Sequence, residues 1–309
     1  MSFSFHEGLP EGLNVHVDSG IFHDPKHLML QAGTGWHSFY IRHNQAVEAM
    51  VHVHVEAHEA ASPYRSPFGS YLVSDAVDKS TLTDFIHYCT QELARKNVSS
   101  VRLKHQPEFY APEKNREIQE ALLAAGYTIA TVETSAIISV TPEPFESGLH
   151  RSEKKRLRKC RDSNLVFESV PPAQLEKIYF FLQDCRKQKG FALSMSFPEI
   201  EKLAGVFPDR ILLTAVTDGS RVVAANISIR VYDHVLYNFY HDHDSEYDQI
   251  SPVVLLNEGL YKICQDRRIR LLDLGTSNPD GRLNESLLDF KLRLGARPVP
   301  KLTFIKKFT

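Results

Sequence analysis

The sequence predicts an α/β protein built from two halves of similar architecture, and three observations indicate this class. Segment 46–56 alternates valines with other residues, as strands do. Segment 251–296 reads as helix, short apolar strand and helix. Both halves mix strands and helices in a comparable order. We therefore expect two domains, 1–145 and 164–309, joined by a linker and basic helix over 146–163. Each domain should be a mixed, mainly antiparallel sheet flanked by helices.

The first half is divided by hydrophobic periodicity and by turn residues. His43-Asn44-Gln45 is the expected turn of a hairpin, and Gly126 ends the last expected helix. The expected elements are strand 13–17, helix 25–31, strands 36–42 and 46–56, loop 62–70, helix 82–96, strand 98–104, helix 118–125 and strand region 127–140.

The second half follows a linker expected over 141–148. Asp218-Gly219 is a strong hairpin signal, and Ser251-Pro252 is typical of a helix start. The expected elements are a basic helix over 150–161, strand 164–169, helices 172–189 and 197–206, strands 211–217, 221–231 and 234–241, a helix from 252, strand 271–274, a helix from 284 to 294 and a last strand 301–308.

Composition restricts the class of protein. Of the 309 residues, 42% are hydrophobic and 24% are charged, and the net charge is −2. These values are ordinary for a soluble protein and do not indicate a surface made for nucleic acid or membrane. The four cysteines show no CxxC spacing, and we read them as reduced thiols. With no signal peptide and no apolar run long enough to span a bilayer, we expect a cytoplasmic protein.

Several histidines lie close together in the sequence and suggest a metal site, but we do not favour that interpretation. His52, His54 and His58 lie on or near one expected strand, and His241 and His243 flank Asp242. Alternate positions on a strand do share a face, but no third ligand can be identified. We expect these histidines to lie on solvent-exposed faces, and we assign no metal site. His241 or His243 as a general base at the mouth of a cleft is an alternative.

Lys291 stands at the edge of the apolar stripe of the last expected helix, beside Leu287, Phe290 and Leu294. A lysine at such an edge either extends along the helix to water or reaches into a cleft beside the preceding strand. Asp273, near the end of that strand, has two interpretations as well. It either holds a reacting group or caps the following turn.

The basic helix also has two interpretations. Arg151, Lys155, Arg158 and Lys159 share one side of it. The simpler interpretation is a solvated connector helix. The functional one is contact with the phosphates of a tRNA or of a nucleotide-linked acceptor.

Four stretches together resemble a known family. They are Tyr64-Arg65-Ser66-Pro67, the basic run 154–160 (KKRLRKC), Leu272-Asp273-Leu274-Gly275, and Phe290-Lys291 followed by Gly295. Their order, and the order of elements in the second half, resemble the GNAT acyltransferase superfamily. The residues themselves are similar to its Fem-type branch of aminoacyl and peptidyl transferases, which carry paired GNAT-like domains.

The resemblance implies transfer of an activated acyl group to an amine. For the Fem-type branch it implies an aminoacyl-tRNA donor and a peptidoglycan precursor as acceptor. It implies that Lys291 lies near the reacting acyl group, where a fixed ammonium stabilises negative charge on the carbonyl oxygen. In its functional interpretation, Asp273 holds that lysine or the attacking amine. The substrate-binding residues expected with them are Arg65, Lys155, Arg158, Lys159, Tyr240 and Phe290.

The donor stays open at this point. The segment 241–251, where a GNAT domain would cradle the pyrophosphate of CoA, contains no glycine and carries four carboxylates. Each carboxylate would repel a pyrophosphate, so standard CoA binding is doubtful. One alternative is an acyl-CoA-dependent GNAT N-acetyltransferase with a nonstandard CoA site. Another is a non-catalytic ligand-binding protein on the same fold. An enzyme acting on lipid headgroups is disfavoured, no cofactor is firmly implied, and we expect a monomer.

Overall fold

The computed structural model describes residues 3–278 and 281–308. These form two compact units, one made of residues up to 133 together with those from 299 onward, and the other of residues 134–298. This division differs from the expected boundaries. The last strand belongs to the first unit, because it pairs with a strand of that unit, and the basic helix is part of the second unit.

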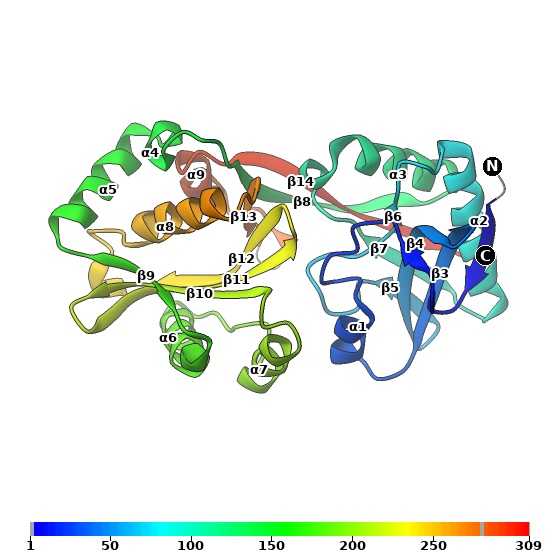
Figure 1. Cartoon of the computed structure of the whole chain (residues 1–309), viewed down its shortest axis with the longest axis horizontal. Helices are drawn as coiled ribbons and strands as arrows, with labels where there is room; N and C mark the ends of the chain where they lie inside the picture. Colours follow the sequence, from blue (N-terminus) through cyan, green and yellow to red (C-terminus); the bar gives the residue numbers. More distant parts are fainter. Residues whose placement is uncertain (1–2, 279–280, 309) are drawn as a thin grey trace. The chain divides into compact units, whose positions relative to one another are not determined.

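The first unit is a mixed sheet with helices, and Figure 1 labels its elements. The strand order is β1-β3-β4-β5-β7-β14, and β2 and β6 pair with β4. Its elements are β1 (Ser4–Glu7), β2 (Asn14–Val15), α1 (Pro25–Gln31), β3 (Trp36–His43), β4 (Ala46–Glu56), β5 (Glu59–Ser62), β6 (Leu72–Val73), α2 (Lys79–Arg95), β7 (Ser100–Lys104), a 3-10 turn (Glu108–Tyr110), α3 (Pro112–Ala124), the start of β8 (Thr128–Ser139) and most of β14 (Arg297–Lys307).

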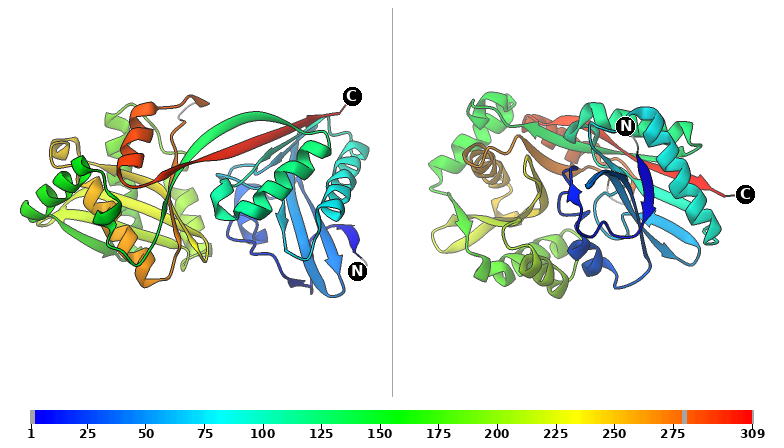
Figure 2. Two further views of the ribbon diagram at one scale, coloured as in Figure 1. Left: turned by 90° about the horizontal axis from the view of Figure 1, so that it is seen from above. Right: turned by 45° about the vertical axis from the view of Figure 1, so that its right-hand side comes forward.

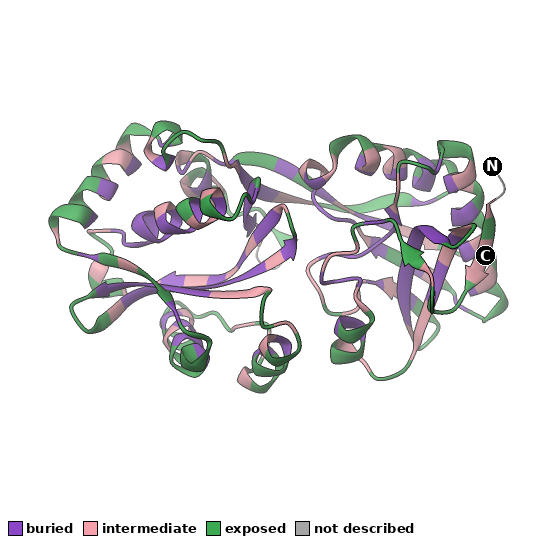
Figure 3. Ribbon diagram, viewed as in Figure 1, coloured by how far each residue is buried: buried purple, intermediate pink, exposed green. Residues whose placement is uncertain are grey.

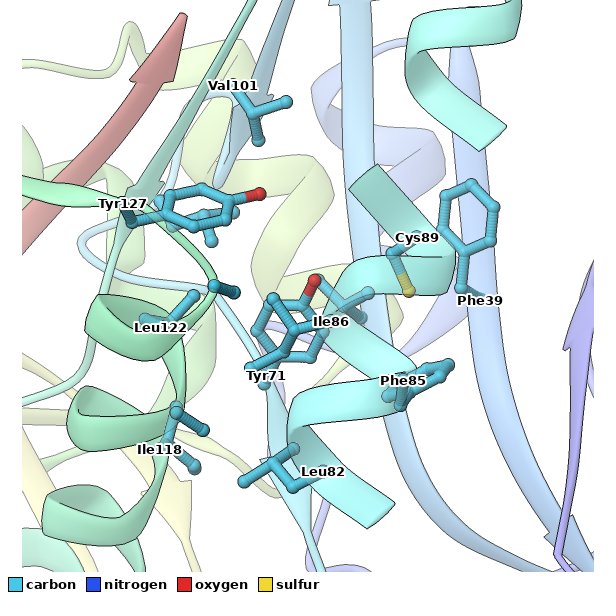
Figure 4. Packing of buried hydrophobic residues seen from close by; sticks show 14 of the residues in the cluster. Phe39, Tyr71, Leu82, Phe85, Ile86, Cys89, Val101, Ile118, Leu122 and Tyr127 are labelled. Carbon is cyan, nitrogen blue, oxygen red and sulfur yellow. The ribbon is translucent and has the colours of Figure 1, made fainter. Parts of the chain in front are cut away.

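Helices α2 and α3 pack on strands of the sheet to form the apolar core of the first unit. Figure 4 shows side chains of both helices packed against the sheet. Tyr71 and Tyr127, which lie outside the helices, pack in the same cluster. Helix α2 begins at Lys79, earlier than expected, because Asp78 caps it by accepting a hydrogen bond from the backbone N–H of Thr81. Strand β8, which enters the second unit, runs beside β14 (Figure 2).

The histidines of β4 are not on a solvent face. His52 and His54 are both buried, so the expectation of an exposed face is wrong for them. Strand β4 is buried along almost its whole length, and the alternation in its sequence therefore separates two covered faces. His58 lies beyond the strand end and is exposed, as expected. Within residues 3–278 and 281–308, no group of three His, Cys, Asp or Glu is arranged to bind a metal ion.

The second unit has a sheet of order β8-β13-β12-β11-β10-β9, in which only β12 and β13 are parallel. Its elements are the end of β8, α4 (Phe145–Gly148), α5 (Arg151–Asp162), β9 (Val166–Val170), a 3-10 turn (Pro172–Gln174), α6 (Leu175–Gln188), α7 (Phe197–Val206), β10 (Ile211–Asp218), β11 (Arg221–Tyr232), β12 (Val235–His243), a 3-10 turn (Ser245–Tyr247), α8 (Val253–Asp266), β13 (Leu271–Thr276) and α9 (Glu285–Arg293).

Helices cover both faces of this second sheet. Helices α6 and α7 lie on one face, and α8 lies on the other (Figure 1). Helix α8 is buried along most of its length (Figure 3). It packs so closely on β9 that a Cβ at Gly259 would lie 2.3 Å from the ring of Phe167. A glycine is therefore required for this approach of helix to strand.

Residues 141–148 are not an extended linker. Phe145 is buried against the core, and the hydroxyl of Tyr261 accepts a hydrogen bond from the Thr141 backbone N–H at 2.9 Å. The proline-rich composition suggested a linker, but one buried aromatic residue is enough to dock this segment on α8.

All four cysteines are free and buried. No helix of the described residues is long and apolar enough to cross a membrane.

Candidate functional site

Residues of the second unit line a cavity of about 580 Å³. It lies where β12 and β13 stop pairing, since their last paired residues are Tyr237 and Asp273. The later residues of both strands form its walls together with the start of α8, and residues of α5, of α9 and of the C-terminal end of α6 contribute the rest. A separation between two parallel strands of this kind is a common place for a ligand in α/β folds.

A β-bulge in β12 shapes one wall of the cavity. Asn238 pairs with Ser228 and Tyr240 pairs with Ile227, so Phe239 is the extra residue. Beyond the bulge His241 pairs with Asn226, which places Asn238 and His241 on one face of the sheet although they are three residues apart. Simple alternation of side chains along β12 therefore fails at the bulge.

Lys291 does not extend to water. It is 3% exposed, lines the cavity, and its Nζ donates to the carbonyl oxygens of Gly275 at 3.0 Å and Thr276 at 2.7 Å. These carbonyls lie at the end of β13, where glycine, with a φ of 76°, turns the chain. The ammonium is therefore fixed between α9 and the strand end. Of the two interpretations, the structure places Lys291 in the cavity.

Asp273 acts on the same strand end. Its carboxylate is buried, and Oδ1 accepts a hydrogen bond from the Gly275 backbone N–H at 2.7 Å. It is not among the residues that line the cavity. This is the turn-capping geometry, and it fixes Gly275, whose carbonyl in turn holds Lys291.

A charged cluster lies farther along β12. The carboxylate of Asp242 pairs with Nζ of Lys189 and lies 3.1 Å from Nε of Arg186, both from the region of α6. Burial and the nearby positive charges of Arg186 and Lys291 lower the pKa of His241 to about 3, so its imidazole is neutral at pH 7. The cations that line the cavity are Arg156, Arg186, Lys189 and Lys291, against the carboxylates Asp242 and Asp248. This balance favours an anionic ligand.

The carboxylates of segment 241–251 all have partners. Arg221 contacts Asp244 at 2.5 Å and Glu246 at 2.7 Å, and His243 lies 2.8 Å from Asp248. With Asp242 paired as well, the repulsion expected for a pyrophosphate is largely compensated. The electrostatic argument against CoA is therefore weaker than the sequence suggested, although the glycine-poor turn remains.

The basic helix α5 presents one unexpected residue to the cavity. Arg156 lines it, and its guanidinium donates to both carboxylate oxygens of the fully buried Glu153, at 3.0 and 3.1 Å. The predicted residues lie on other sides of the helix. Lys155 is exposed, Arg158 contacts Glu146 at 3.5 Å, and Lys159 donates to the Gln249 carbonyl at 2.8 Å.

The remaining predicted residues are dispersed. Phe290 lines the cavity beside Lys291. Tyr240 does not line it, and its hydroxyl lies 2.6 Å from Ser194 Oγ and accepts from the Met195 backbone N–H at 2.8 Å. Arg65 belongs to the first unit, where it is exposed and its guanidinium lies over the ring of Tyr64.

Sequence reasoning missed several polar residues of the cavity. Arg186 and Lys189 gave no local signal, because their approach to Asp242 depends on how α6 docks. Asn238 did give one, since it occupies a position that alternation assigns to the buried face between Leu236 and Tyr240. Asn226 and Ser228 interrupt the neighbouring strand in the same way. Polar residues at apolar positions of two paired strands could have identified this wall.

Comparison with known families finds a match for the segment that holds the cavity. Residues 150–291 match the family described as acetyltransferase (GNAT) domain. A comparison with curated proteins finds no significant match. The matched segment includes every described residue that lines the cavity, from Arg156 to Lys291.

Solved structures extend the likeness to the whole chain. The crystal structure of FemX superposes with a TM-score of 0.71 at 11% identity and covers 94% of each chain. L-PGS from Bacillus licheniformis gives 0.61 at 10% identity, with 92% of each chain covered. A tandem GNAT protein from the clavulanic acid biosynthesis pathway gives 0.54 at 10% identity, covering 99% of this chain and 98% of the other. At such identities the likeness shows the fold.

These matches confirm the fold class, and they confirm the resemblance to the Fem-type branch at the level of fold. Residues 150–291 match the GNAT acetyltransferase domain family, and the whole chain has a fold similar to those of FemX and of a tandem GNAT protein.

Proposed function

We propose that this protein transfers an activated acyl or aminoacyl group to an amine, and that the reaction takes place in the cavity of the second unit. The GNAT family and the fold support acyl transfer in general. The position of Lys291 is the observation that carries the proposal for this site. A lysine that is almost fully buried and lines a cavity is uncommon unless it has a task there.

The chemistry needs a fixed positive charge. The amine nitrogen attacks the acyl carbonyl carbon, a C–N bond forms, and the C–O bond of an ester or the C–S bond of a thioester breaks. The proton lost by the amine ends on the leaving oxygen or sulfur. Negative charge develops on the carbonyl oxygen during the attack, and the ammonium of Lys291 stabilises it without reorganising, because two backbone carbonyls already hold it.

Asp273 serves this site as a positioning residue. It fixes the backbone N–H of Gly275, and the carbonyl of the same glycine accepts from Lys291. Loss of the Asp273 carboxylate would loosen the turn and so misplace the ammonium. Phe290, which precedes Lys291 and lines the cavity, supplies an apolar surface for the acyl group.

The excess of cations around the cavity supports a donor or acceptor that carries phosphate. The motifs that resemble Fem-type transferases imply a charged tRNA as donor and an amine-bearing acceptor such as a peptidoglycan precursor, and the similarity of the fold to that of FemX supports this proposal. The exposed side of α5, with Lys155 and Arg158, would contact the tRNA backbone.

An acyl-CoA donor is the second candidate, and one observation favours it. Ser251 and Val253, at the start of α8, line the cavity, and the carboxylates just before them are paired with Arg221 and His243. A helix start without uncompensated negative charge nearby is compatible with a pyrophosphate.

Transfer assays with matched donors distinguish the candidates. The purified protein is incubated with radiolabelled acetyl-CoA, with longer acyl-CoAs, or with bulk aminoacylated tRNA, each with a UDP-linked muramyl peptide and with simple amines as acceptors. Thermal shift with the same compounds reports binding in the absence of turnover. We expect transfer from one donor class. Binding of these compounds without any transfer would contradict the proposal and favour a non-catalytic binding protein.

A further inference from the structure

Asn238 carries a buried hydrogen-bond donor that has no partner among the described residues. Its side chain is 2% exposed, and among the contacts of the described residues its Nδ2 has no hydrogen-bond partner. An amide N–H taken out of water without a partner costs about 1–3 kcal/mol. Such a group persists in a folded protein where a ligand, a water or a task provides the missing partner.

The orientation of this amide is fixed by its neighbours rather than chosen freely. Nδ2 of Asn226 donates to the backbone carbonyl of Tyr240 at 3.1 Å, so that atom must be the nitrogen. The same Nδ2 also donates to Oδ1 of Asn238. The atom of Asn238 that faces Asn226 is therefore the oxygen, and its NH₂ group is turned the other way.

A polar chain holds Asn226 in turn. Its Oδ1 accepts from Ser228 Oγ at 2.6 Å and from Thr214 Oγ1 at 3.4 Å. All of these side chains are buried within the sheet. A buried, ordered chain of this kind preorganises its last member, which here is the amide of Asn238.

Asn238 lies in the wall of the cavity, next to the strand end that holds Lys291. Asn238 is a lining residue, and its backbone oxygen lies 4.0 Å from the position that a Cβ would take on Gly275. The carbonyl of Gly275 is a partner of Lys291. His241, on the same face of β12, adds a second buried nitrogen, the ring Nδ1, without a partner among the described residues.

We propose that the side-chain amide of Asn238 binds the carbonyl oxygen of the acyl donor and, with Lys291, stabilises the charge that develops on it. The proposal rests on the proposed function and names a second group for the same oxygen. One preorganised donor of this kind contributes about 100-fold to kcat in acyl-transfer enzymes.

A spectroscopic test separates this role from a structural one. Acetonyl-CoA, in which a ketone replaces the thioester, is labelled with ¹³C at the ketone carbon and bound to the whole protein. The amide analogue 3′-alanylamino-3′-deoxyadenosine, labelled at its carbonyl, is the probe for a tRNA-type donor. A hydrogen bond from Asn238 moves the ¹³C resonance of the bound carbonyl downfield. We expect this displacement in the native protein and its loss in Asn238→Ala.

Two further variants serve as controls for folding. Asn238→Asp keeps the oxygen that accepts from Asn226 but removes the donor, so it should lose the displacement while the polar chain stays intact. Asn257→Ala removes another buried asparagine, whose Nδ2 donates to the Val253 carbonyl at 2.8 Å and which does not line the cavity. It should lower the melting temperature without changing the carbonyl resonance.

The outcomes for the inference and for the proposed function differ. A carbonyl resonance equal in the native protein and in both Asn238 variants overturns the inference, and so does failure of both probes to bind. Transfer activity that persists undiminished in Asn238→Asp overturns the inference while the proposed function stands. A displacement that depends on Asn238, in a protein without transfer activity, supports the inference and contradicts the proposed function.

Discussion

The two units bury polar side chains in different ways. In the first unit the buried polar groups include neutral histidines, and each is held by a nearby group. His23 contacts the Ser70 carbonyl at 3.1 Å, His52 contacts Ser38 Oγ at 2.7 Å, and His105 contacts Asn115 Oδ1 at 3.1 Å. In the second unit the buried polar groups include the charged side chains of Asp242 and Lys291, and both of these line one cavity.

This difference indicates a structural role for the buried histidines of the first unit and a ligand-binding role for the charged groups of the second. Neutral imidazoles that each contact a separate polar partner are compatible with a packed interior as long as they stay uncharged. Charged groups collected around an open volume stabilise the fold less than apolar packing would, and such an arrangement is typical of a site that binds and transforms a ligand. The comparison therefore predicts that acid unfolds the first unit, while substitutions at the cavity of the second unit change substrate binding or the rate of transfer.

Acid should have the largest effect, and it should act first on the first unit. Burial lowers the pKa of His23, His27 and His105 to about 4 and that of His52 to about 3. The unfolded chain binds protons on these groups near pH 6.5, so stability is complete above that pH. Each histidine then removes up to about 1.4 kcal/mol per pH unit as the pH falls towards its folded pKa.

The single tryptophan makes this measurable, because Trp36 lies in the first unit. Its fluorescence, followed from pH 7 to 3.5, should change at higher pH than the far-ultraviolet circular dichroism of the whole chain. His52→Phe should shift the fluorescence transition to lower pH, whereas replacement of the exposed His87 by Gln should not. Coincident transitions in both signals would contradict this contrast between the units.

Replacement of Glu153 should have the next largest effect, because this residue, in the first turn of α5, pairs with two arginines. Its fully buried carboxylate accepts from Arg156 and, at 3.1 Å, from Arg293 Nε. We expect Glu153→Ala to destabilise the second unit by about 3 kcal/mol, since it removes a buried ion-pair partner. Urea unfolding followed by circular dichroism measures this, with the exposed Glu201→Ala as control. Equal midpoints for both variants would show that Glu153 is not structural.

Arg186 should affect substrate binding more than folding. It faces Asp242 in the cavity and is one of the cations that favour an anionic ligand. We expect Arg186→Met to raise KM for a phosphate-bearing donor about tenfold at low salt, and less at high salt, because salt screens the lost charge. Arg210→Met, which removes the contact with Asp233 outside the cavity, is the matched control. An unchanged KM would argue against an anionic ligand.

Arg158 should give the smallest effect on stability. Its contact with Glu146 is 3.5 Å long and largely exposed, so Arg158→Ala should change the free energy of unfolding by less than about 0.5 kcal/mol. If α5 contacts tRNA, the variant should also reduce the salt dependence of tRNA binding by about one ion. Lys177→Ala on α6 controls for nonspecific charge loss. An identical salt slope for both variants would favour the simple connector role.

Local patterns were sufficient for much of the fold. The bounds of α1, β4 and α7 coincide with those expected, and Asp218-Gly219 does lie at the turn between β10 and β11. Lys291 was identifiable because it departs from an otherwise apolar stripe and stands in a recognisable motif. These features depend only on residues close together in the chain.

The rest of the site depends on tertiary structure. The bulge at Phe239 changes which residues of β12 share a face of the sheet, and no local sequence pattern predicts this bulge. Arg156 was not selected among the many basic residues of α5, because the choice depends on where Glu153 is buried. His52 was placed in solvent because a second covered face of β4 cannot be inferred from its alternation.

Replacement of Lys291 tests the central claim most directly. Single-turnover transfer is measured for the native protein, for Lys291→Met, and for Lys262→Met, which changes an exposed lysine on α8. Circular dichroism and the melting temperature establish that each variant is folded. We predict that Lys291→Met slows transfer at least about 100-fold, while Lys262→Met transfers at the native rate. A folded Lys291→Met variant that transfers at the native rate would contradict the account.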